Sequence, residues 1–474
     1  MQRPMAVATI ATAVVLLAGC SGSNDDKSDS TSESGGSTKA SAPAVASFDP
    51  PKAFVAMSAF GVERTEKDSQ YTLQAGMVGQ TSLISGLTGV TGRNIAAHGQ
   101  PWTVPSVAAP TTETVDATAP MGVQLDGKDV VAIAYVQNDK GNGTQKAKGQ
   151  VVFQWLNATD GKKVAEVTAD LTPALGAGQG GDNVVSQAYD AATGQIVVGV
   201  GAAGEEAANK GGEVFTVYAD PKTQKSTVIP FVTPAGVLNG VVAGAKGRNL
   251  EGAGDGTIVI ADGTTGKITK QTSTKQDYLN PAGSGSKRAY LASNSYEGND
   301  KYNNVLYSVD YASGAVVQTK LQVVDDQVST ATCWGDQAKA VVCTSGTSGA
   351  SGGKEIIGFD DTTGKKTWGY TGKSASRLVP AVTAAFHGVV YAQSEVQPVL
   401  MDAATGADIR TPSATSMPSF SKDPSTTNGS DMSLYDGKLR SPTAVTQYGG
   451  AYLQAPGGSN YDLQSVLIAM APTA

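Results

Sequence analysis

The sequence predicts an all-β protein, a β-propeller built from four-stranded blades, and three observations lead to that prediction. A short phrase, apolar-Asp-x-x-Thr/Ser-Gly, returns along most of the chain. Strand-like runs flank its copies, as Gly256–Ile260 and Lys267–Thr269 flank one of them. Windows with apolar residues at i, i+3, i+4 and i+7 are few, whereas Thr, Val and Gly-rich turns dominate, which favours strands over amphipathic helices.

The repeated phrase has the chemistry of a hairpin corner. Its Asp side chain accepts hydrogen bonds from nearby backbone N–H groups, and its Gly supplies the positive φ that a tight connection needs. Two looser copies begin at Asn157 and Asp220, the second without its glycine. A spacing of roughly 30–50 residues is the period of propeller blades. We therefore expect structural roles for the Asp and Gly of the clean copies, which are Asp190 and Gly194, Asp262 and Gly266, Asp310 and Gly314, Asp360 and Gly364, and Asp402 and Gly406.

Length and charge bound the class of protein. A chain of 474 residues fits one large repeat domain or two to three ordinary domains. The formal net charge is −7, and the sequence has no stripe of clustered Lys and Arg that would release counterions from a phosphate backbone. Nucleic acid is therefore not an expected partner.

Residues 1–20 have the pattern of an export signal, with Arg3 ahead of a short apolar run. The run is too short for a stable membrane-spanning helix. It ends in Leu17-Ala18-Gly19-Cys20, which resembles the lipobox of bacterial lipoproteins. The resemblance implies cleavage before Cys20 and lipidation of that cysteine. We expect a protein anchored by its lipid at the extracytoplasmic face of a cell membrane, inner or outer.

Residues 21–50 are rich in Ser, Gly, Asp, Lys and Thr. Such a segment cannot bury enough apolar surface to offset chain entropy, so we expect a disordered tether. Its r.m.s. reach as a flexible coil is about 30 Å. The remaining residues, 51–474, are the expected propeller domain.

The chain after residue 120 repeats a blade template. Residues 121–125 and 129–135 flank Asp126-Gly127, a strong hairpin signal, and a third strand leads to the loose copy at Asn157. The template is strand, tight turn, strand, variable loop, strand, repeat turn, strand. The copy at Asp190 departs from it by joining the first pair of strands, so residues 157–220 are expected to form one blade with an insertion.

We expect seven or eight blades, with eight preferred, and a ring closed by an N-terminal strand. After a polar surface loop of roughly 411–436, the last block offers only three strands. A propeller closes by pairing its last blade with a strand from the other end of the chain, because closure removes exposed edges. Phe54–Met57 is the expected closing strand.

Apart from Cys20, the chain has two cysteines, Cys333 and Cys343, on two strands joined by Gly335-Asp336-Gln337. A cross-hairpin disulfide is geometrically reasonable there, and export favours it over two buried free thiols. Closing a loop of about 11 residues would stabilise the fold by about 2–3 kcal/mol on the chain-entropy model.

The phrase from Asp360 to Trp368, Asp-x-x-Thr-Gly-x-x-x-Trp, resembles the repeat of quinoprotein-like β-propellers, and the resemblance covers most of residues 120–410. This superfamily contains quinone-dependent dehydrogenases and also non-enzymatic envelope lipoproteins. Its enzymes carry a tryptophan in nearly every repeat, a vicinal Cys-Cys pair and Ca²⁺ ligands. This chain has four Trp and no adjacent cysteines. The departures favour the non-enzymatic branch, with neither Ca²⁺ nor pyrroloquinoline quinone as an expected cofactor.

Few residues point to other chemistry. The two histidines, His98 and His387, lack metal-ligand spacing and are expected in loops. No Gly-x-Ser-x-Gly occurs in a strand–turn–helix context, although a Ser-His-Asp triad needs no neighbouring members. Two oxygen-rich loops, Asn138–Gly143 and Asn294–Asn304, have ligand types that suit Ca²⁺, with solvated loops as the alternative.

These observations predict a lipid-anchored extracytoplasmic scaffold that performs no catalysis. It would bind a partner protein of the cell envelope, or an envelope ligand, through the loops at one end of the propeller, since loops vary freely on a rigid scaffold. The alternatives are a quinone-dependent dehydrogenase and a lipoprotein that senses a carbohydrate or another solute.

Overall fold

The computed structural model describes residues 50–54, 73–95, 100–106, 111–176, 179–202, 214–246, 256–299, 301–324, 331–346, 354–394, 397–409, 441–454 and 466–470. All of them belong to one compact unit, Ala46–Ala474. The predicted signal peptide, nearly the whole predicted tether, Cys20 and His98 lie outside the described residues.

The described residues form antiparallel sheets that follow chain order. Five sheets have four strands: β1 (Gln74–Val78), β2 (Thr81–Gly86), β3 (Gly89–Asn94) and β4 (Trp102–Pro105); β10 (Gly181–Tyr189), β11 (Ile196–Ala202), β12 (Val214–Asp220) and β13 (Lys225–Pro230); β14 (Thr233–Leu238), β15 (Val241–Lys246), β16 (Thr257–Asp262) and β17 (Ile268–Ser273); β18 (Tyr278–Ser284), β19 (Arg288–Gly298), β20 (Lys301–Asp310) and β21 (Val316–Lys320); and β22 (Ala331–Gly335), β23 (Ala340–Ser345), β24 (Glu355–Asp360) and β25 (Lys365–Thr371).

The other sheets depart from four strands. One contains β5 (Thr112–Ala117), β6 (Met121–Leu125), β7 (Lys128–Asp139), β8 (Lys148–Asn157) and β9 (Lys163–Asp170), with β5 and β6 pairing different halves of the long strand β7. Two have three described strands: β26 (Ala381–Phe386), β27 (Val389–Gln393) and β28 (Pro398–Asp402); and β29 (Ala444–Thr446), β30 (Gly449–Gln454) and β31 (Val466–Met470). Two one-turn helices, α1 (Thr172–Leu175) and α3 (Gly372–Ala375), lie in connections between sheets.

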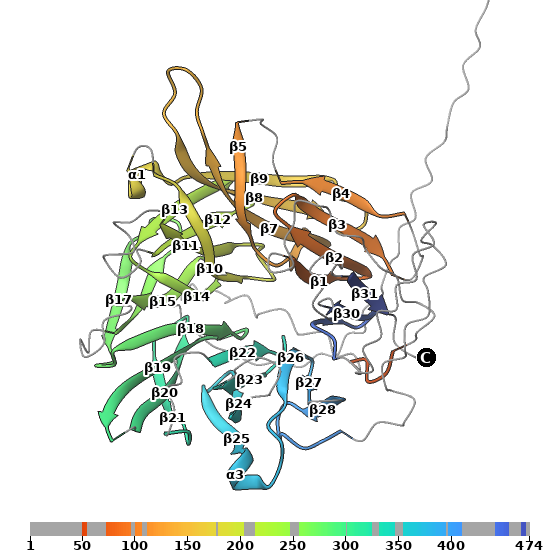
Figure 1. The fold of residues 1–474 in the computed structure, drawn as a ribbon, viewed down its shortest axis with the longest axis vertical. Helices are drawn as coiled ribbons and strands as arrows, with labels where there is room; N and C mark the ends of the chain where they lie inside the picture. The colour runs from red at the N-terminus through yellow and green to blue at the C-terminus, as the bar shows by residue number, and fades with distance from the viewer. Residues whose placement is uncertain are drawn as a thin grey trace, which may run out of the picture. The chain divides into compact units, whose positions relative to one another are not determined.

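The first strands of successive sheets contact one another around a ring, which defines a β-propeller. Strand β10 contacts β14, β14 contacts β18, β18 contacts β22, β22 contacts β26 and β26 contacts β29, while β1 contacts both β29 and β6. Figure 1 shows β10, β14, β18, β22 and β26 nearer the centre than the later strands of their blades. Seven sheets lie between Gln74 and Asp402 and one more lies between Ala444 and Met470. The predicted all-β propeller of mainly four-stranded blades is confirmed.

The strands in the middle of a blade are buried on both faces. In β7, Val130, Ala132 and Ala134 belong to one apolar cluster, whereas Val131 and Ile133 belong to another on the opposite face. Successive side chains point to opposite faces of a strand, so a blade packed between two neighbours needs apolar residues at consecutive positions. This explains the unbroken run of apolar residues from Val130 to Val136.

The repeat turns have the predicted geometry. In the turn after β16, Asp262 Oδ1 accepts hydrogen bonds from the backbone N–H of Thr265 (2.8 Å) and from its hydroxyl (3.1 Å). Gly266, at φ 72°, donates its N–H to the carbonyl oxygen of Asp262 (2.8 Å). The same Gly-to-Asp backbone bond closes the turns at Asp190, Asp310, Asp360 and Asp402. Each Asp therefore fixes its own hairpin.

The Asp190 turn joins β10 to β11, as predicted from its position. The prediction that residues 157–220 form a single blade is wrong. The Asn157 turn joins β8 to β9 in one sheet, and β10 begins the next. Two repeat turns fall within one blade here because the Asp220 turn joins β12 to β13 of the sheet that also contains the Asp190 turn.

The preceding blade also contacts most of the repeat turns. Trp368 on β25 donates its indole N–H to the carbonyl oxygen of Ala403 (2.9 Å), and its ring covers Gly406 in the next blade. Trp102 on β4 makes the equivalent contact with Ala158 and Gly161. Where no tryptophan is present, another donor takes its place, as when Lys270 Nζ donates to the carbonyl oxygen of Gly314 (2.8 Å).

The predicted closing strand Phe54–Met57 lies outside the described residues except for Phe54. The Phe54 ring packs edge-on against Tyr452 of β30, with ring centroids 5.7 Å apart, and also approaches Tyr391 of β27. The Tyr391 hydroxyl donates to the carbonyl oxygen of Pro51 (2.5 Å). Residues 50–54 are thus held between the last two sheets, while pairing of a closing strand stays a prediction.

Candidate functional site

The antiparallel order gives the propeller two ends. The turns that join the first to the second strand of a blade, and the third to the fourth, lie at one end, which we call the turn end. The connections between second and third strands, and the crossovers from one blade to the next, lie at the other, which we call the crossover end. The repeat residues predicted from the sequence are all at the turn end.

At the turn end the polar side chains hold neighbouring blades together. Asp190 Oδ2 accepts from the N–H of Asn239 (2.8 Å) in the next blade, and Asp336 Oδ2 accepts from the N–H of Gly388 (3.0 Å). Thr446 Oγ1 donates to the carbonyl oxygen of Gly79 (2.8 Å) across the junction between the last and first sheets. The side-chain oxygens of Asp190, Asp336 and Thr446 are therefore used in hydrogen bonds that hold the turns and blades together.

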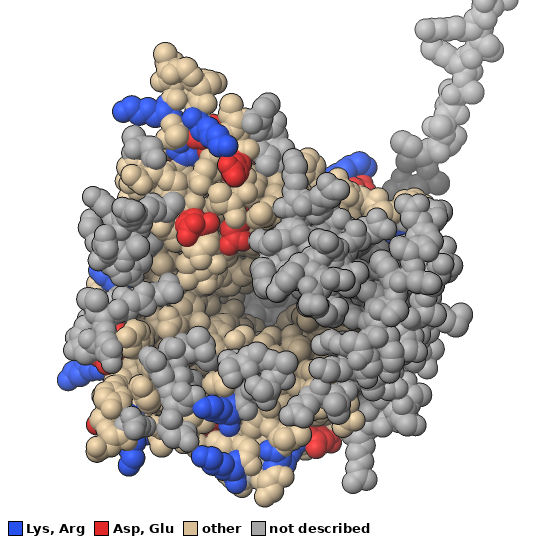
Figure 2. All heavy atoms as spheres, viewed as in Figure 1, with Lys and Arg blue, Asp and Glu red and all other residues tan. Residues whose placement is uncertain are grey.

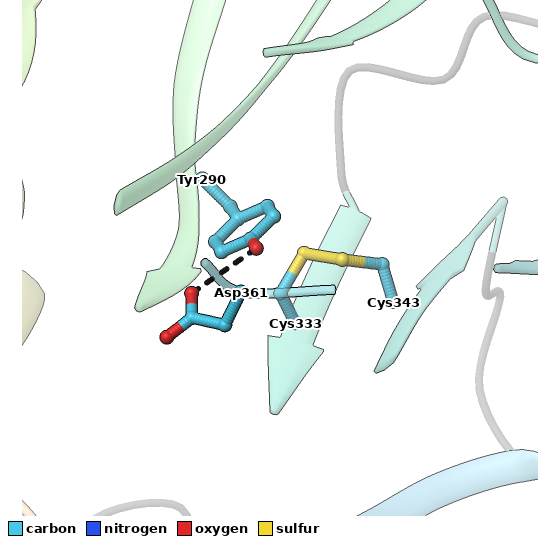
Figure 3. Close-up of a disulfide and its surroundings, with 4 residues drawn as sticks. All are labelled: Tyr290, Cys333, Cys343 and Asp361. Carbon is cyan, nitrogen blue, oxygen red and sulfur yellow. Dashed lines mark hydrogen bonds between the residues drawn. A yellow bond between two sulfur atoms is a disulfide. The ribbon is translucent and has the colours of Figure 1, made fainter. Parts of the chain in front are cut away.

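The most deeply buried carboxyl of this end is Asp361, next to the predicted turn residue Asp360. It accepts hydrogen bonds from the Tyr290 hydroxyl (3.2 Å), from Ser286 Oγ (3.0 Å) and from the N–H of Lys287 (2.8 Å), all in the preceding blade. Burial raises the pKa of Asp361 although these donors oppose the shift. Figure 3 shows the Tyr290–Asp361 pair beside the disulfide. The pair joins two blades, and both side chains are buried.

Cys333 and Cys343 lie directly opposite each other on β22 and β23, with Cα atoms 4.0 Å apart, and are joined by a disulfide. Both are buried in the apolar cluster that contains Tyr290, Val323 and Phe359 between two blades. The disulfide therefore strengthens a hairpin within a blade junction (Figure 3).

His387 occupies the turn between β26 and β27 at φ 42°. Its backbone N–H donates to the carbonyl oxygen of Asp336 (2.7 Å), and its ring lies against Phe386 at 4.6 Å. Burial lowers the pKa of His387, and the nearby Asp336 carboxylate opposes that shift. The loop position predicted for this histidine is confirmed.

Exposed apolar side chains gather at the crossover end. Among the described residues, four of the six large apolar side chains that are exposed lie there: Phe231, Val324 and Leu378 on crossovers, and Tyr296 near the end of β19. Phe231 is 52% exposed and has φ 58°, a conformation that is an outlier for a bulky residue. Strained backbone positions of this kind are found preferentially at functional and ligand-binding sites.

The junction between the blades β18–β21 and β22–β25 has polar groups at the crossover end. Asn304 Nδ2 donates to the carbonyl oxygen of Val323 (2.7 Å), and Glu355 Oε2 accepts from the N–H groups of Gln322 (2.7 Å) and Val323 (3.2 Å). Asn294 lies opposite Asn304, and neither atom of its buried amide has a hydrogen-bond partner. We call Asn294, Asn304, Val323 and Glu355 the polar junction.

Glu355 has an unusual environment within this junction. Its side chain is fully buried, Oε1 has no hydrogen-bond partner, and Lys366 Nζ stands 3.9 Å from that oxygen. Burial raises the pKa of Glu355, with the two N–H donors and Lys366 opposing the shift. The Oγ of Ser345, directly opposite Glu355 on β23, is also buried without a partner.

An aromatic pair lies on the same face of the β19–β20 hairpin as Asn294 and Asn304, closer to the solvent-exposed end of the hairpin. Tyr296 and Tyr302 lie opposite each other on β19 and β20, with ring centroids 5.3 Å apart. Tyr296 is 49% exposed. No repeat or motif in the sequence singles out this pair, because only the register of β19 on β20 brings residues 296 and 302 together.

The oxygen-rich loops do not assemble a metal site in the part of the chain that the structure describes. Asn138 pairs through Oδ1 and Nδ2 with the N–H and carbonyl of Gly181 (3.1 and 3.0 Å), and Asp139 accepts from the N–H of Gly141. No group of three His, Cys, Asp or Glu side chains with metal-binding geometry occurs among the described residues.

Two features bear on the surroundings of the protein. No helix among the described residues has the length and hydropathy needed to cross a membrane. Figure 2 shows the Lys and Arg side chains of one face dispersed around the rim.

No family model matches the chain, and no curated protein matches it in sequence. Solved structures similar to it include the Dos1 propeller, at 10% identity and TM-score 0.43, covering 85% of this chain and 96% of that one. The dihydro-heme d1 dehydrogenase NirN in complex with DHE has 13% identity and TM-score 0.44, covering 78% and 75%. The β-propeller domain of the Trilobed protease from Pyrococcus furiosus has 11% identity and TM-score 0.39, covering 78% and 97%. At these identities the likeness concerns the fold alone.

Proposed function

We propose that this protein is a membrane-anchored, extracytoplasmic β-propeller lipoprotein that binds a partner protein or a ligand of the cell envelope through its crossover end. It performs no catalysis in this proposal. The lipobox-like sequence ending in Cys20 supports the anchor, and the Ser- and Gly-rich residues 21–50 support a flexible tether.

The observation that carries the proposal is the gathering of exposed apolar side chains at one end of the propeller. The turn end uses its polar groups to join blades, whereas the crossover end exposes Phe231, Tyr296, Val324 and Leu378. Tyrosine is enriched among the few residues that dominate the binding energy of an interface, and Tyr296 is one of the exposed side chains here. Tyr296 lies on strand β19, and the other three side chains lie on crossovers that join rigid blades, so part of the entropic cost of ordering them is already met before a partner binds.

The test is site-specific photo-crosslinking in cells that produce the full-length protein. A photoreactive residue replaces Phe231 or Leu378 at the crossover end, and Val164 on β9 serves as the matched control, because Val164 is as exposed as Phe231, at 52%. We expect the same crosslinked species from positions 231 and 378, and none from position 164. A Cys20→Ala variant should lose the crosslinks together with membrane attachment.

Two results would contradict the proposal. Equal crosslinking from all three positions would show that the crossover end has no preference for a partner. A Cys20→Ala variant that stays in the membrane fraction would remove the lipid anchor from the proposal.

A further inference from the structure

The junction of the blades β18–β21 and β22–β25 combines an exposed aromatic pair with unpaired buried polar atoms, and a ligand site there rests on the proposed binding role of the crossover end. Tyr296 and Asn294 are two residues apart on β19, and Tyr302 and Asn304 are two apart on β20. Residues at i and i+2 of a strand share one face and lie about 7 Å apart. The tyrosine pair and the Asn294–Asn304 pair therefore form two adjacent rows on one face.

The row formed by Tyr296 and Tyr302 offers an exposed aromatic surface. The Tyr296 and Tyr302 rings are tilted by 55° to each other, so together they form an angled platform. Tyrosine combines a flat apolar face with a polar tip and loses little conformational entropy when it binds. Such a platform suits a ligand that has an apolar face of ring size and polar groups at its edge.

In the row formed by Asn294 and Asn304, the Asn294 side chain has unused hydrogen-bonding capacity. Asn294 is 1% exposed, yet both Oδ1 and Nδ2 lack a protein partner. A buried amide without partners costs free energy, so in solution its atoms bind water or a ligand group. An amide with both atoms free pairs well with a group that has one donor and one acceptor. Glu355 Oε1 and Ser345 Oγ, which are also buried without hydrogen-bond partners, add acceptor and donor capacity on the neighbouring blade.

We propose that the tyrosine pair and the polar junction form a saccharide subsite. One sugar ring lies with its C–H face on Tyr296 and Tyr302, and its hydroxyl or acetamido groups reach Asn294 through a bridging water. Saccharides meet both requirements, because they combine apolar ring faces with many donors and acceptors. Water-mediated contacts are nearly as favourable in enthalpy as direct ones. An apolar peptide side chain would offer the water at Asn294 no hydrogen bond.

The experiment titrates the purified full-length mature protein with a tetramer of N-acetylglucosamine and, separately, with a tetramer of glucose, using isothermal titration calorimetry. We expect saturable binding of at least one of them. Tyr296→Ala and Tyr302→Ala should each weaken it by about tenfold or more, a change of about 1.4 kcal/mol in binding free energy. Phe231→Ala, which removes an exposed aromatic ring elsewhere at the crossover end, should leave the affinity unchanged.

Asn294→Leu tests the polar row, with Asn294→Asp as a second variant that keeps the shape if the leucine variant does not fold. Either folded variant should bind the saccharide several-fold more weakly. Absence of binding to both tetramers, or binding unaffected by both tyrosine variants, overturns the inference. Photo-crosslinks from positions 231 and 378 that persist in such a case would leave the proposed partner binding intact, so the two failures are distinguishable.

Discussion

The contact between Trp368 and Gly406 can be tested by a double-mutant cycle. A Cβ atom added at Gly406 would lie 2.6 Å from Trp368 Cδ2, and Gly406 also has φ 70°. Gly406→Ala therefore has two costs, the strained backbone and the overlap with the indole ring. Gly127 is a matched control, since it has φ 72° and no atom lies within 4 Å of its added Cβ.

The magnitudes follow from these two costs. Gly127→Ala should lower the free energy of unfolding by about 1–2 kcal/mol, the cost of a left-handed conformation for an L-residue. Gly406→Ala should add about 1–3 kcal/mol for overpacking. Trp368→Ala alone should cost about 2–3 kcal/mol, because the ring is only half-buried and removal of a fully buried aromatic costs about 3–5 kcal/mol.

In the double variant the overlap disappears together with the ring. Gly406→Ala in the Trp368→Ala background should then cost no more than Gly127→Ala, which gives a coupling energy of about 1–3 kcal/mol. Urea denaturation followed by tryptophan-independent far-UV circular dichroism measures all four proteins and the control. Additive costs, or equal costs for Gly406→Ala and Gly127→Ala in the unaltered protein, would refute the packing of Trp368 on this turn.

Three further predictions concern the disulfide, a buried carboxyl and the N-terminal segment. The double variant Cys333→Ser/Cys343→Ser, which opens a link of sequence separation 10, should lower stability by about 2–3 kcal/mol, and a thermal melt that does not change would refute this. Burial raises the pKa of Glu355, so the folded state binds more protons than the unfolded state, and stability falls as the pH rises from the unfolded value of about 4.3 through the folded pKa. Glu355→Gln should flatten this decline in a pH series of urea midpoints, and an unchanged slope would count against it. Tyr391→Phe removes the hydrogen bond to Pro51 and should cost about 1 kcal/mol while speeding proteolysis near residue 54, whereas equal cleavage rates would contradict the anchoring of residues 50–54.

The local pattern was sufficient to predict the blades. The Asp at the start and the Gly at the end of each clean copy are needed by the turn itself, because the Asp side chain and the positive φ of the Gly act within five residues. Continuous apolar runs such as Val130–Val136 indicate in their own composition a strand that is buried on both faces. Such features depend on neighbours along the chain, and the sequence therefore reveals them.

The boundaries between blades were harder to predict. Residues 157–220 read as one blade because the Asn157, Asp190 and Asp220 turns look alike, whereas the strands divide between two sheets. The identity of a turn does not say which pair of strands it joins. Hydrogen-bonded register decides that question, and register involves residues far apart in the chain.

By itself the sequence determined the fold class, the repeat turns and the position of the cysteines opposite each other on one hairpin. Only the tertiary structure decided which residues meet between blades and at the crossover end. Asp361 meets Tyr290 of the preceding blade, and Tyr296 meets Tyr302 over the unpaired amide of Asn294. The physical reason is that short-range turn chemistry is encoded by neighbouring residues, while burial and partner choice are set by the packing of one sheet on the next.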